Sequence, residues 1–156
     1  MIIAIAAAPT LDRAKRAAEL AAGKARIVAD PGRGLVAARG FQTMYEVPRD
    51  LQTELRLALF DAHAAELDKG GPVVFDHCVA EWIADWMRWH WAAVSTRAWD
   101  AAMDKAAALA KRYDRVDLLR EGPARGYDGY FWLDAPNARQ IAELLPFVLA
   151  RLGAKT

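Results

Sequence analysis

Acidic and basic residues follow directly on three of the chain's apolar runs, in the segments Ala7–Lys15, Asp76–His77 and Arg120–Asp134. Carboxylates can hold magnesium or accept protons, and basic side chains can hold anions. Such groups form one site when their segments leave the same edge of a parallel sheet, because ligands of α/β proteins bind beyond the carboxyl ends of the strands. We therefore expect the candidate functional site at these three segments.

The single cysteine and the three histidines give no independent sign of a catalytic or metal centre. Cys78 stands where a helix is predicted to begin, a position that can lower a thiol pKa, but no Cys/His/Asn arrangement accompanies it, which favours a buried structural thiol. His63, His77 and His90 are too scattered for a metal motif. We interpret His77 as a packed or surface turn residue, and we predict no metal site.

The elements that would position the three segments alternate between strands and helices. Apolar runs predict strands, and apolar periodicity between caps and glycines predicts helices, with Asp12 capping the first helix and Gly23 ending it. Strands are expected at 2–8, 26–29, 72–76 and 113–119, and helices at 12–23, 49–69, 78–91, 97–112 and 135–152. This order predicts an α/β fold with a small, mainly parallel sheet in one domain, 1–156.

Two further expectations concern the arrangement of these elements. Continuous apolar character is typical of strands covered on both faces. It predicts that the strand 2–8 lies centrally, between the strands at 73–75 and 116–119. The stretch 30–48, rich in glycine and proline, is expected to be a long loop, a length that is uncommon unless the loop is functional or partly structured.

The central part of the chain resembles a known family. The stretch GGPVVFDHCVAEWIADW is similar to the strand of small P-loop kinases that ends in Asp-Arg and leads into a helix with a second Asp. Asp76 takes the strand-end position, His77 stands where arginine is usual, and Asp85 lies on the helix. DLQTELRLALFDAHAAELDKGG resembles the helix before that strand, and YDRVDLL followed by Tyr127-Asp128-Gly129 resembles the fourth strand and lid.

The resemblance is to nucleoside and nucleotide kinases, including small AAA-like ATP-binding proteins, and it covers nearly the whole chain. It implies a three-layer P-loop-kinase-like fold. Asp76 would hold magnesium through water or accept a substrate proton, unless it is only a turn carboxylate. Arg120 and Arg125 would supply lid cations to a phosphoryl group, unless they are solvated or pair with acids in their own loop.

The phosphate-binding loop departs from the family pattern G-x-x-x-x-G-K-[ST] at each defining position. Without gaps, AAPTLDRA places Ala7 and Asp12 at the glycines, Arg13 at the lysine and Ala14 at the hydroxyl. Arg13 could still contact phosphate, whereas Asp12 repels it and Ala14 cannot ligate magnesium. A register that keeps Lys15 as the lysine fits no better. Arg13 and Lys15 remain the candidate phosphate-binding residues of this loop.

These departures favour a degenerate kinase-like protein without phosphotransfer activity. It would act as a binding or assembly module that retains at most weak nucleotide or anion binding. The alternative is an active ATP-dependent kinase with a rebuilt phosphate loop. ATP and magnesium are expected cofactors only under that alternative.

Tryptophan is unusually frequent, with six in 156 residues. Trp82, Trp86 and Trp89 follow one helix face, which is typical of a core stripe, but Trp89 and Trp91 cannot both face one core. We therefore predict that Trp89 or Trp91, together with Trp86 as a weaker candidate, forms an interface with a protein partner or a second copy. The alternative is that neighbouring helices bury the whole stripe.

Overall charge and hydropathy give no support to nucleic-acid binding or to a membrane-spanning protein. The formal net charge is +1, so nucleic-acid binding is not indicated. No apolar run reaches the roughly 18 residues of a membrane span. MIIAIAAAPT lacks the basic start of a signal peptide, and a cytoplasmic location is expected.

Overall fold

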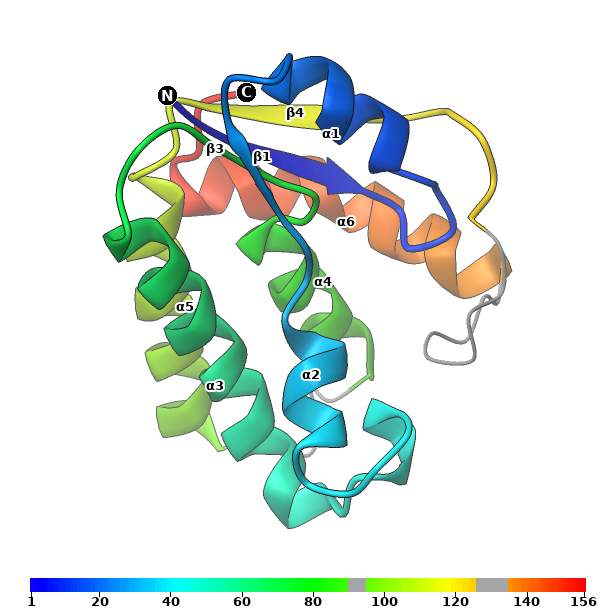
Figure 1. The fold of residues 1–156 in the computed structure, drawn as a ribbon. Coiled ribbons are helices and arrows are strands. Elements are labelled where there is room, and N and C mark those ends of the chain that lie inside the picture. The colour runs from blue at the N-terminus through cyan, green and yellow to red at the C-terminus, as the bar shows by residue number, and fades with distance from the viewer. Residues whose placement is uncertain (90–94, 126–134) are drawn as a thin grey trace.

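The computed structural model describes the backbone of residues 1–89, 95–125 and 135–156 (Figure 1). Within these ranges the chain forms a four-stranded sheet in the order β2-β3-β1-β4. The strands are β1 (Ile2–Ala7), β2 (Arg26–Val28), β3 (Val73–Phe75) and β4 (Arg115–Leu119). Every pairing is parallel. The predicted α/β class and parallel sheet are confirmed.

Strand β1 lies between β3 and β4, as its continuous apolar character predicted. Its side chains alternate between the two faces of the sheet, as the period of a strand requires. Ile3 and Ile5 pack with Ala17 and Ala21 of α1 on one face. The other face belongs to the main core. A strand buried on both faces needs apolar residues at every position, which explains the unbroken run.

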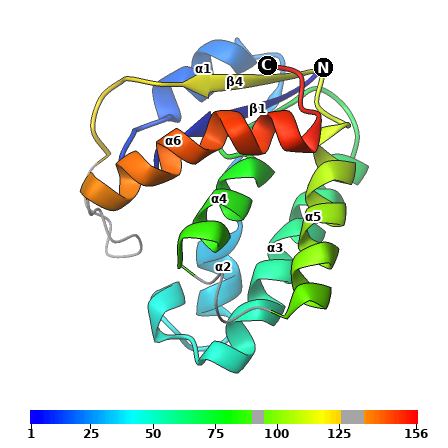
Figure 2. The same cartoon turned by 180° about the vertical axis from the view of Figure 1, so that it is seen from behind.

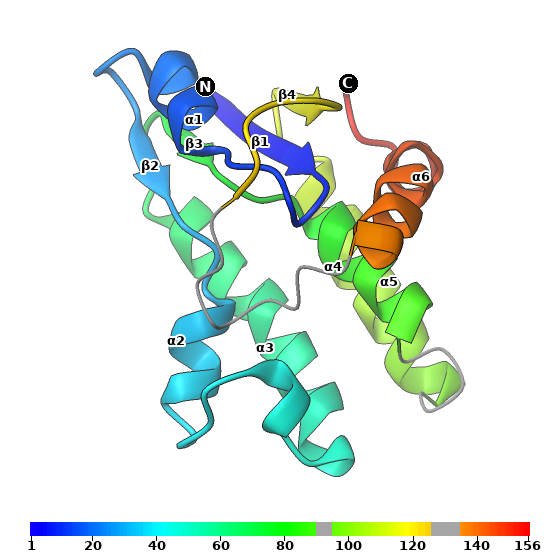
Figure 3. The same ribbon diagram turned by 90° about the vertical axis from the view of Figure 1, so that its right-hand side faces the viewer.

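The described helices cover both faces of this sheet. They are α1 (Ala14–Ala21), α2 (Gly32–Ala37), α3 (Arg49–Asp68), α4 (Val79–Trp89), α5 (Thr96–Ala110) and α6 (Ala135–Leu152). Helix α1 lies on one side of the sheet and α6 runs along the other, as the two opposite views show (Figures 1 and 2). Helices α3 and α5 extend away from the strands (Figure 3). None of the described helices has the length and apolarity to cross a membrane.

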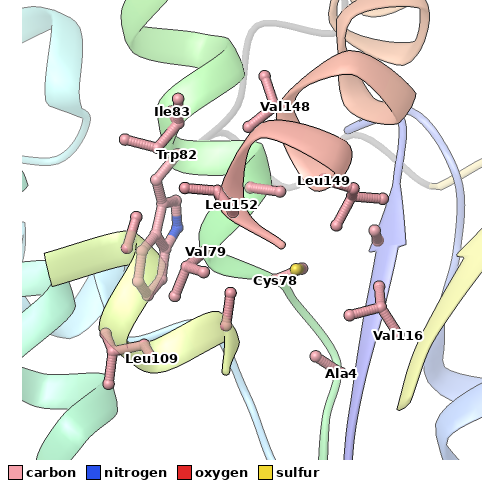
Figure 4. Packing of buried hydrophobic residues seen from close by; sticks show 14 of the residues in the cluster. Ala4, Cys78, Val79, Trp82, Ile83, Leu109, Val116, Val148, Leu149 and Leu152 are labelled. Atoms are coloured by element: carbon pink, nitrogen blue, oxygen red, sulfur yellow. The ribbon is translucent and has the colours of Figure 1, made fainter. Parts of the chain in front are cut away.

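The main core lies between the sheet, α4 and α6. Figure 4 shows residues of β1, α4, α5 and α6 converging on it, with Cys78 between Val79 and the sheet. The Cys78 side chain is fully buried, and this burial raises the pKa of its thiol to about 12. A thiol that stays protonated is a weak nucleophile, so Cys78 is structural, as the sequence favoured.

The segment 30–48 is not the long loop that its glycines predicted. It contains α2 and a short 3₁₀ helix, Met44–Glu46. The Asp30 carboxylate accepts the Gly32 N–H at 2.7 Å, which helps the turn into α2. Val36 of α2 then packs with Val47 and Leu55 in a small core of its own. Tertiary packing of these apolar side chains thus overrides the weak local propensity.

Helix α1 is shorter than the predicted 12–23. It begins at Ala14, whose N–H donates to the Asp12 carboxylate at 2.9 Å, so Asp12 does satisfy a backbone donor at the helix start. At the other end Ala22 already has a left-handed backbone, with φ of 45°, and Gly23 follows with φ of 69°. The helix therefore ends two residues before the predicted limit.

Trp86 does not belong to an exposed interface. Its side chain is buried, with 1% of the residue exposed, and its ring lies 6.2 Å from that of Trp99 in an edge-on contact. Trp82 is buried too, so these two residues form the core stripe that the alternative predicted. The physical reason is that α5 and α6 both pack on α4 and cover this face. Trp91 and the side chain of Trp89 lie outside the described residues.

Candidate functional site

A pocket of about 420 Å³ lies beyond the carboxyl ends of β1, β2 and β3. Its lining includes Asp12 and Arg13 after β1, Asp30 after β2, Asp76 after β3, and Arg125 from the segment after β4. All three segments singled out in the sequence therefore contribute to one site. Its volume lies in the range of small-molecule pockets, roughly 300–1,000 Å³.

The segment after β4 is tied to the loop between β1 and α1 by backbone pairing. Leu11 and Ala124 form an antiparallel bridge. The Asp12 N–H donates to the Pro123 carbonyl at 2.9 Å, and the Arg125 N–H donates to the Thr10 carbonyl at 2.7 Å. This pairing places Arg125 at the pocket. It also commits the Asp12 N–H of the loop to a hydrogen bond within the protein.

Arg13 folds back under the loop and is held there by three acceptors. Its guanidinium donates to the Asp76 carbonyl at 2.9 Å and to the Ala7 carbonyl at 3.3 Å. It also forms an ion pair with Glu81 at 2.8 Å, in which each side chain is only 11% exposed. The arginine therefore occupies the inside of the loop with its charge already matched.

Glu81 is the partner that the sequence did not reveal. It lies in the first turn of α4, and its other oxygen accepts the Ala7 N–H at 3.1 Å. Burial raises the pKa of this carboxyl to about 7, against the opposing effect of Arg13. An acidic residue in the first turn of a helix is expected to face solvent and to interact favourably with the helix dipole. Here the register of α4 directs it into the fold instead.

The pKa of Glu81 makes the pH dependence of stability a test of this geometry. From its usual 4.5 up to about 7 the folded chain holds a proton that the unfolded chain has lost, so rising pH reduces this residue's contribution to stability. As the pH rises from 5 to 8, the free energy of unfolding of the Glu81→Gln variant should increase relative to that of the natural chain, by on the order of 3 kcal/mol.

Urea unfolding of both proteins across this range measures the difference. The pKa of His63 is lowered to about 2, chiefly by burial, so below pH 6.5 this residue makes stability rise with pH. That opposite contribution is common to both proteins and cancels in their difference. A difference that stays constant from pH 5 to 8 would show that Glu81 keeps an ordinary pKa.

The Asp76 carboxylate lies at the pocket, and one of its two oxygens takes part in hydrogen bonds within the protein. Its Oδ1 accepts the Asp30 N–H at 3.0 Å and faces His77 Nδ1 at 3.1 Å. The Asp30 carboxylate in turn accepts the Trp82 indole N–H at 3.0 Å. The strand-end aspartate is thus fixed in place and 32% exposed, so it can meet a ligand.

Behind Asp76 runs a buried chain of hydrogen bonds. His77 Nε2 lies 3.0 Å from His63 Nδ1, and His63 Nε2 lies 2.8 Å from the Tyr113 hydroxyl. His63, His77 and Tyr113 are each at most 1% exposed. We call these three residues together with Asp76 the relay chain. His77 is therefore a packed residue, although the sequence did not reveal its partners.

Only one set of proton positions satisfies every member of the relay chain with both rings neutral. An ionised Asp76 accepts, so His77 carries its proton on Nδ1 and accepts at Nε2. His63 must then donate from Nδ1 and accept at Nε2, and Tyr113 must donate its hydroxyl proton. Burial lowers the pKa of His63 and raises that of Tyr113, which agrees with a neutral ring and a protonated phenol.

A second buried ion pair lies on the pocket wall. Arg56 of α3 donates to Asp85 of α4 at 2.6 Å, and its side chain is 6% exposed. The guanidinium also lies 6.0 Å from the centre of the Trp86 ring. Nothing in the sequence singles out Arg56, because an arginine on a long helix is usually a solvated residue.

Two of the predicted phosphate-binding residues are not part of the pocket. Lys15 and Arg120 are exposed, and neither lines it among the described residues. Arg16, the neighbour of Lys15, pairs with Asp117 on the sheet. Arg33 does line the pocket. Of the four candidate cations, Arg13 and Arg125 are thus the ones brought to the site.

The sequence matches no family model and no curated protein. Chemical interpretation of the pocket therefore depends on its own residues. Among the described residues no three metal-binding side chains converge, so the arrangement offers no resident metal centre in that part of the chain. What it offers is a pocket lined by apolar and aromatic side chains together with five carboxylates and four arginines, of which Arg13 and Arg56 are paired with Glu81 and Asp85.

Proposed function

We propose that this chain is a P-loop-kinase-like domain that binds a small molecule in its pocket and does not transfer phosphoryl groups. The observation that carries the proposal is the position of Arg13, which fills the loop after β1 and is paired with Glu81. Phosphate loops need open backbone N–H groups and an uncommitted cation. In this chain the N–H groups of the loop and the Arg13 guanidinium already bind other groups of the protein.

The backbone donors of the loop support the proposal. The Ala7 N–H donates to Glu81, and the Leu11 N–H donates to the Ala8 carbonyl at 3.0 Å. The Asp12 N–H donates to Pro123, and the Ala14 N–H donates to the Asp12 carboxylate. Pro9 has no N–H. Few loop amides therefore remain to hold a polyphosphate.

The resemblance to P-loop kinases is supported by the arrangement of the matching segments. A central first strand, a long helix α3 before β3, and an aspartate at the carboxyl end of β3 agree with the order in which the family segments were matched. Helices on both faces of the sheet agree with the three-layer fold that the resemblance implies. The proposal is that this scaffold has been kept while its phosphate loop was lost.

Calorimetry and thermal unfolding with Mg-ATP test the proposal. We expect no binding at about 1 mM nucleotide. A micromolar ligand at about a hundredfold excess over its dissociation constant would stabilise the fold by about 2.7 kcal/mol. For a chain of this size that equals an increase in Tm of roughly 5–10 °C.

Glu81→Gln provides the matched variant, because it removes the charge that neutralises Arg13 and keeps the shape of the side chain. This variant is expected to bind inorganic phosphate more tightly than the natural chain, whereas Glu19→Gln on the exposed side of α1 should behave as the natural chain does. Micromolar Mg-ATP binding by the natural chain, or phosphate transfer from it to any nucleoside, would favour the active-kinase alternative and overturn the proposal.

A further inference from the structure

Of the five carboxylates that line the pocket, Asp76 is one of three that form no ion pair with an arginine or lysine of the described chain. Asp76 receives its two hydrogen bonds on Oδ1, from a backbone N–H and from His77. Arg13 touches this residue only at its backbone carbonyl. Within the described ranges, no side-chain or backbone donor reaches Asp76 Oδ2. One oxygen of an exposed anion is therefore left for a ligand.

The relay chain makes Asp76 an acceptor and leaves it no proton to give. Each member donates toward the next, from the Tyr113 hydroxyl through His63 and His77 to the carboxylate. Reversing the chain would make the Tyr113 oxygen accept from His63 and leave the hydroxyl proton of Tyr113 without an acceptor among the described hydrogen bonds. A carboxylate fixed in this way favours a ligand group that donates hydrogen bonds and disfavours phosphate or carboxylate oxygens.

The other charges of the pocket point in the same direction. Its described lining holds five carboxylates and four arginines. Arg13 is matched by Glu81 and Arg56 by Asp85, in contacts of 2.8 and 2.6 Å. Asp30 has both oxygens occupied, by the Gly32 and Trp82 N–H groups. Asp12 accepts one hydrogen bond, from the Ala14 N–H, whereas Asp76 is held by a backbone N–H and by the relay chain, so Asp76 is the lining carboxylate fixed in place to meet a ligand.

Part of the lining of this pocket is apolar and aromatic. Met44, Leu59, Trp82 and Ile141 line the pocket together with the charged groups. The hydrogen bond from the Trp82 indole to Asp30 fixes the orientation of that ring. A pocket with apolar walls and a few placed polar groups is suited to an organic ligand with a hydrophobic body.

We infer that the pocket binds a small organic amine, whose protonated nitrogen donates to Asp76 Oδ2 and whose apolar body lies against Leu59 and Trp82. This inference rests on the proposed small-molecule binding and specifies its ligand class. His77 and His63 act as positioning residues, since they orient the carboxylate without touching the ligand.

Three probes with one phenylethyl body and different head groups test the inference. They are phenethylamine, phenethyl alcohol and 3-phenylpropionate, titrated into the natural full chain at pH 7 and followed by NMR and calorimetry. The amine should bind at least about tenfold more tightly than the other two, because it alone gives a charge-assisted hydrogen bond to the carboxylate. Shifted resonances should include Asp76, Trp82 and Leu59.

Two variants complete the experiment. Asp76→Asn should weaken amine binding by about tenfold or more and remove the preference over the alcohol. Asp104→Asn, at an exposed residue of α5 that does not line the pocket, should change affinity by less than about twofold. Tighter binding of the acid, an unaffected Asp76→Asn variant, or no amine binding at about 10 mM would overturn the inference.

Failure of the proposed function gives a different result from failure of this inference. Micromolar Mg-ATP binding would overturn the proposed function whatever the amine does. Tighter binding of 3-phenylpropionate would leave the small-molecule site in place and overturn only the assignment of an amine to it.

Discussion

The Arg13→Ala variant should be less stable than the natural chain by about 3–5 kcal/mol near pH 8. The substitution leaves Glu81 buried without its cation and removes the donors of the Ala7 and Asp76 carbonyls. At pH 5 the loss should be smaller, because Glu81 then takes up a proton and carries no charge. Urea unfolding at both pH values measures the two losses.

Two further variants separate loss of the ion pair from loss of packing. The double variant Arg13→Ala with Glu81→Gln should recover most of the stability lost at pH 8, because a neutral amide needs no cation and still accepts the Ala7 N–H. Arg39→Ala, which removes an exposed pair with Glu54, should cost less than about 1 kcal/mol. A double variant no more stable than Arg13→Ala would assign the loss to packing alone.

The sheet was predictable from the sequence because its strands are short apolar runs. β1 and β3 contain no polar residue, which is the pattern of strands covered on both faces, and both lie at interior positions. The helix α2 was missed because Gly32 and Gly34 are poor helix formers. Its stability comes from burial of Val36 against Val47, a contact that local propensity does not contain.

The candidate site was predictable only to the level of segments. Parallel strands bring the residues after β1, β2 and β3 to one edge, so Asp76 and Arg13 could be expected near each other. Glu81 and Arg56 could not, because their inward direction depends on the register of α4 and α3. An ion pair between residues 13 and 81 leaves no local spacing pattern in the sequence.

The tryptophan stripe shows the limit of helical periodicity. Spacing of four residues placed Trp82 and Trp86 on one face, and the structure buries both. Periodicity does not say whether the neighbouring helices are long enough to cover that face. Helices α5 and α6 do cover it, so the expectation of an exposed Trp86 was wrong, while the interface expected at Trp89 and Trp91 stays a prediction.

The relay chain was beyond sequence analysis for a related reason. His63 comes from α3, His77 follows β3, and Tyr113 precedes β4, so the three meet only after the sheet has formed. Taken singly, each residue reads in the sequence as a buried histidine or tyrosine with one hydrogen-bond partner and gives no sign of the other two. Their meeting, with distances of 2.8 and 3.0 Å along one line of bonds, makes them energetically dependent on one another.

His63→Leu should therefore destabilise the fold by about 2–6 kcal/mol, the second of the two large effects. Leucine removes the middle of the relay chain, so the Tyr113 hydroxyl loses the acceptor of its proton and His77 Nε2 loses its partner in the core. Each orphaned buried group costs about 1–3 kcal/mol. Urea unfolding at pH 7 gives the loss, and Phe147→Leu, at a largely exposed side chain of α6, should stay within about 0.5 kcal/mol of the natural chain.

Tyr113→Phe makes this prediction specific to hydrogen bonding, because its effect should depend on the residue at position 63. In the natural chain it leaves His63 Nε2 unpaired and should cost about 1–3 kcal/mol. In the His63→Leu background the hydroxyl has already lost this histidine and keeps only its backbone hydrogen bond with Val79, so the same substitution should cost clearly less. Equal losses in both backgrounds would mean that the two residues only pack against each other. Nitrogen NMR of the natural chain should then find His63 neutral at pH 7, with its proton on Nδ1, because its Nε2 accepts the Tyr113 hydroxyl proton.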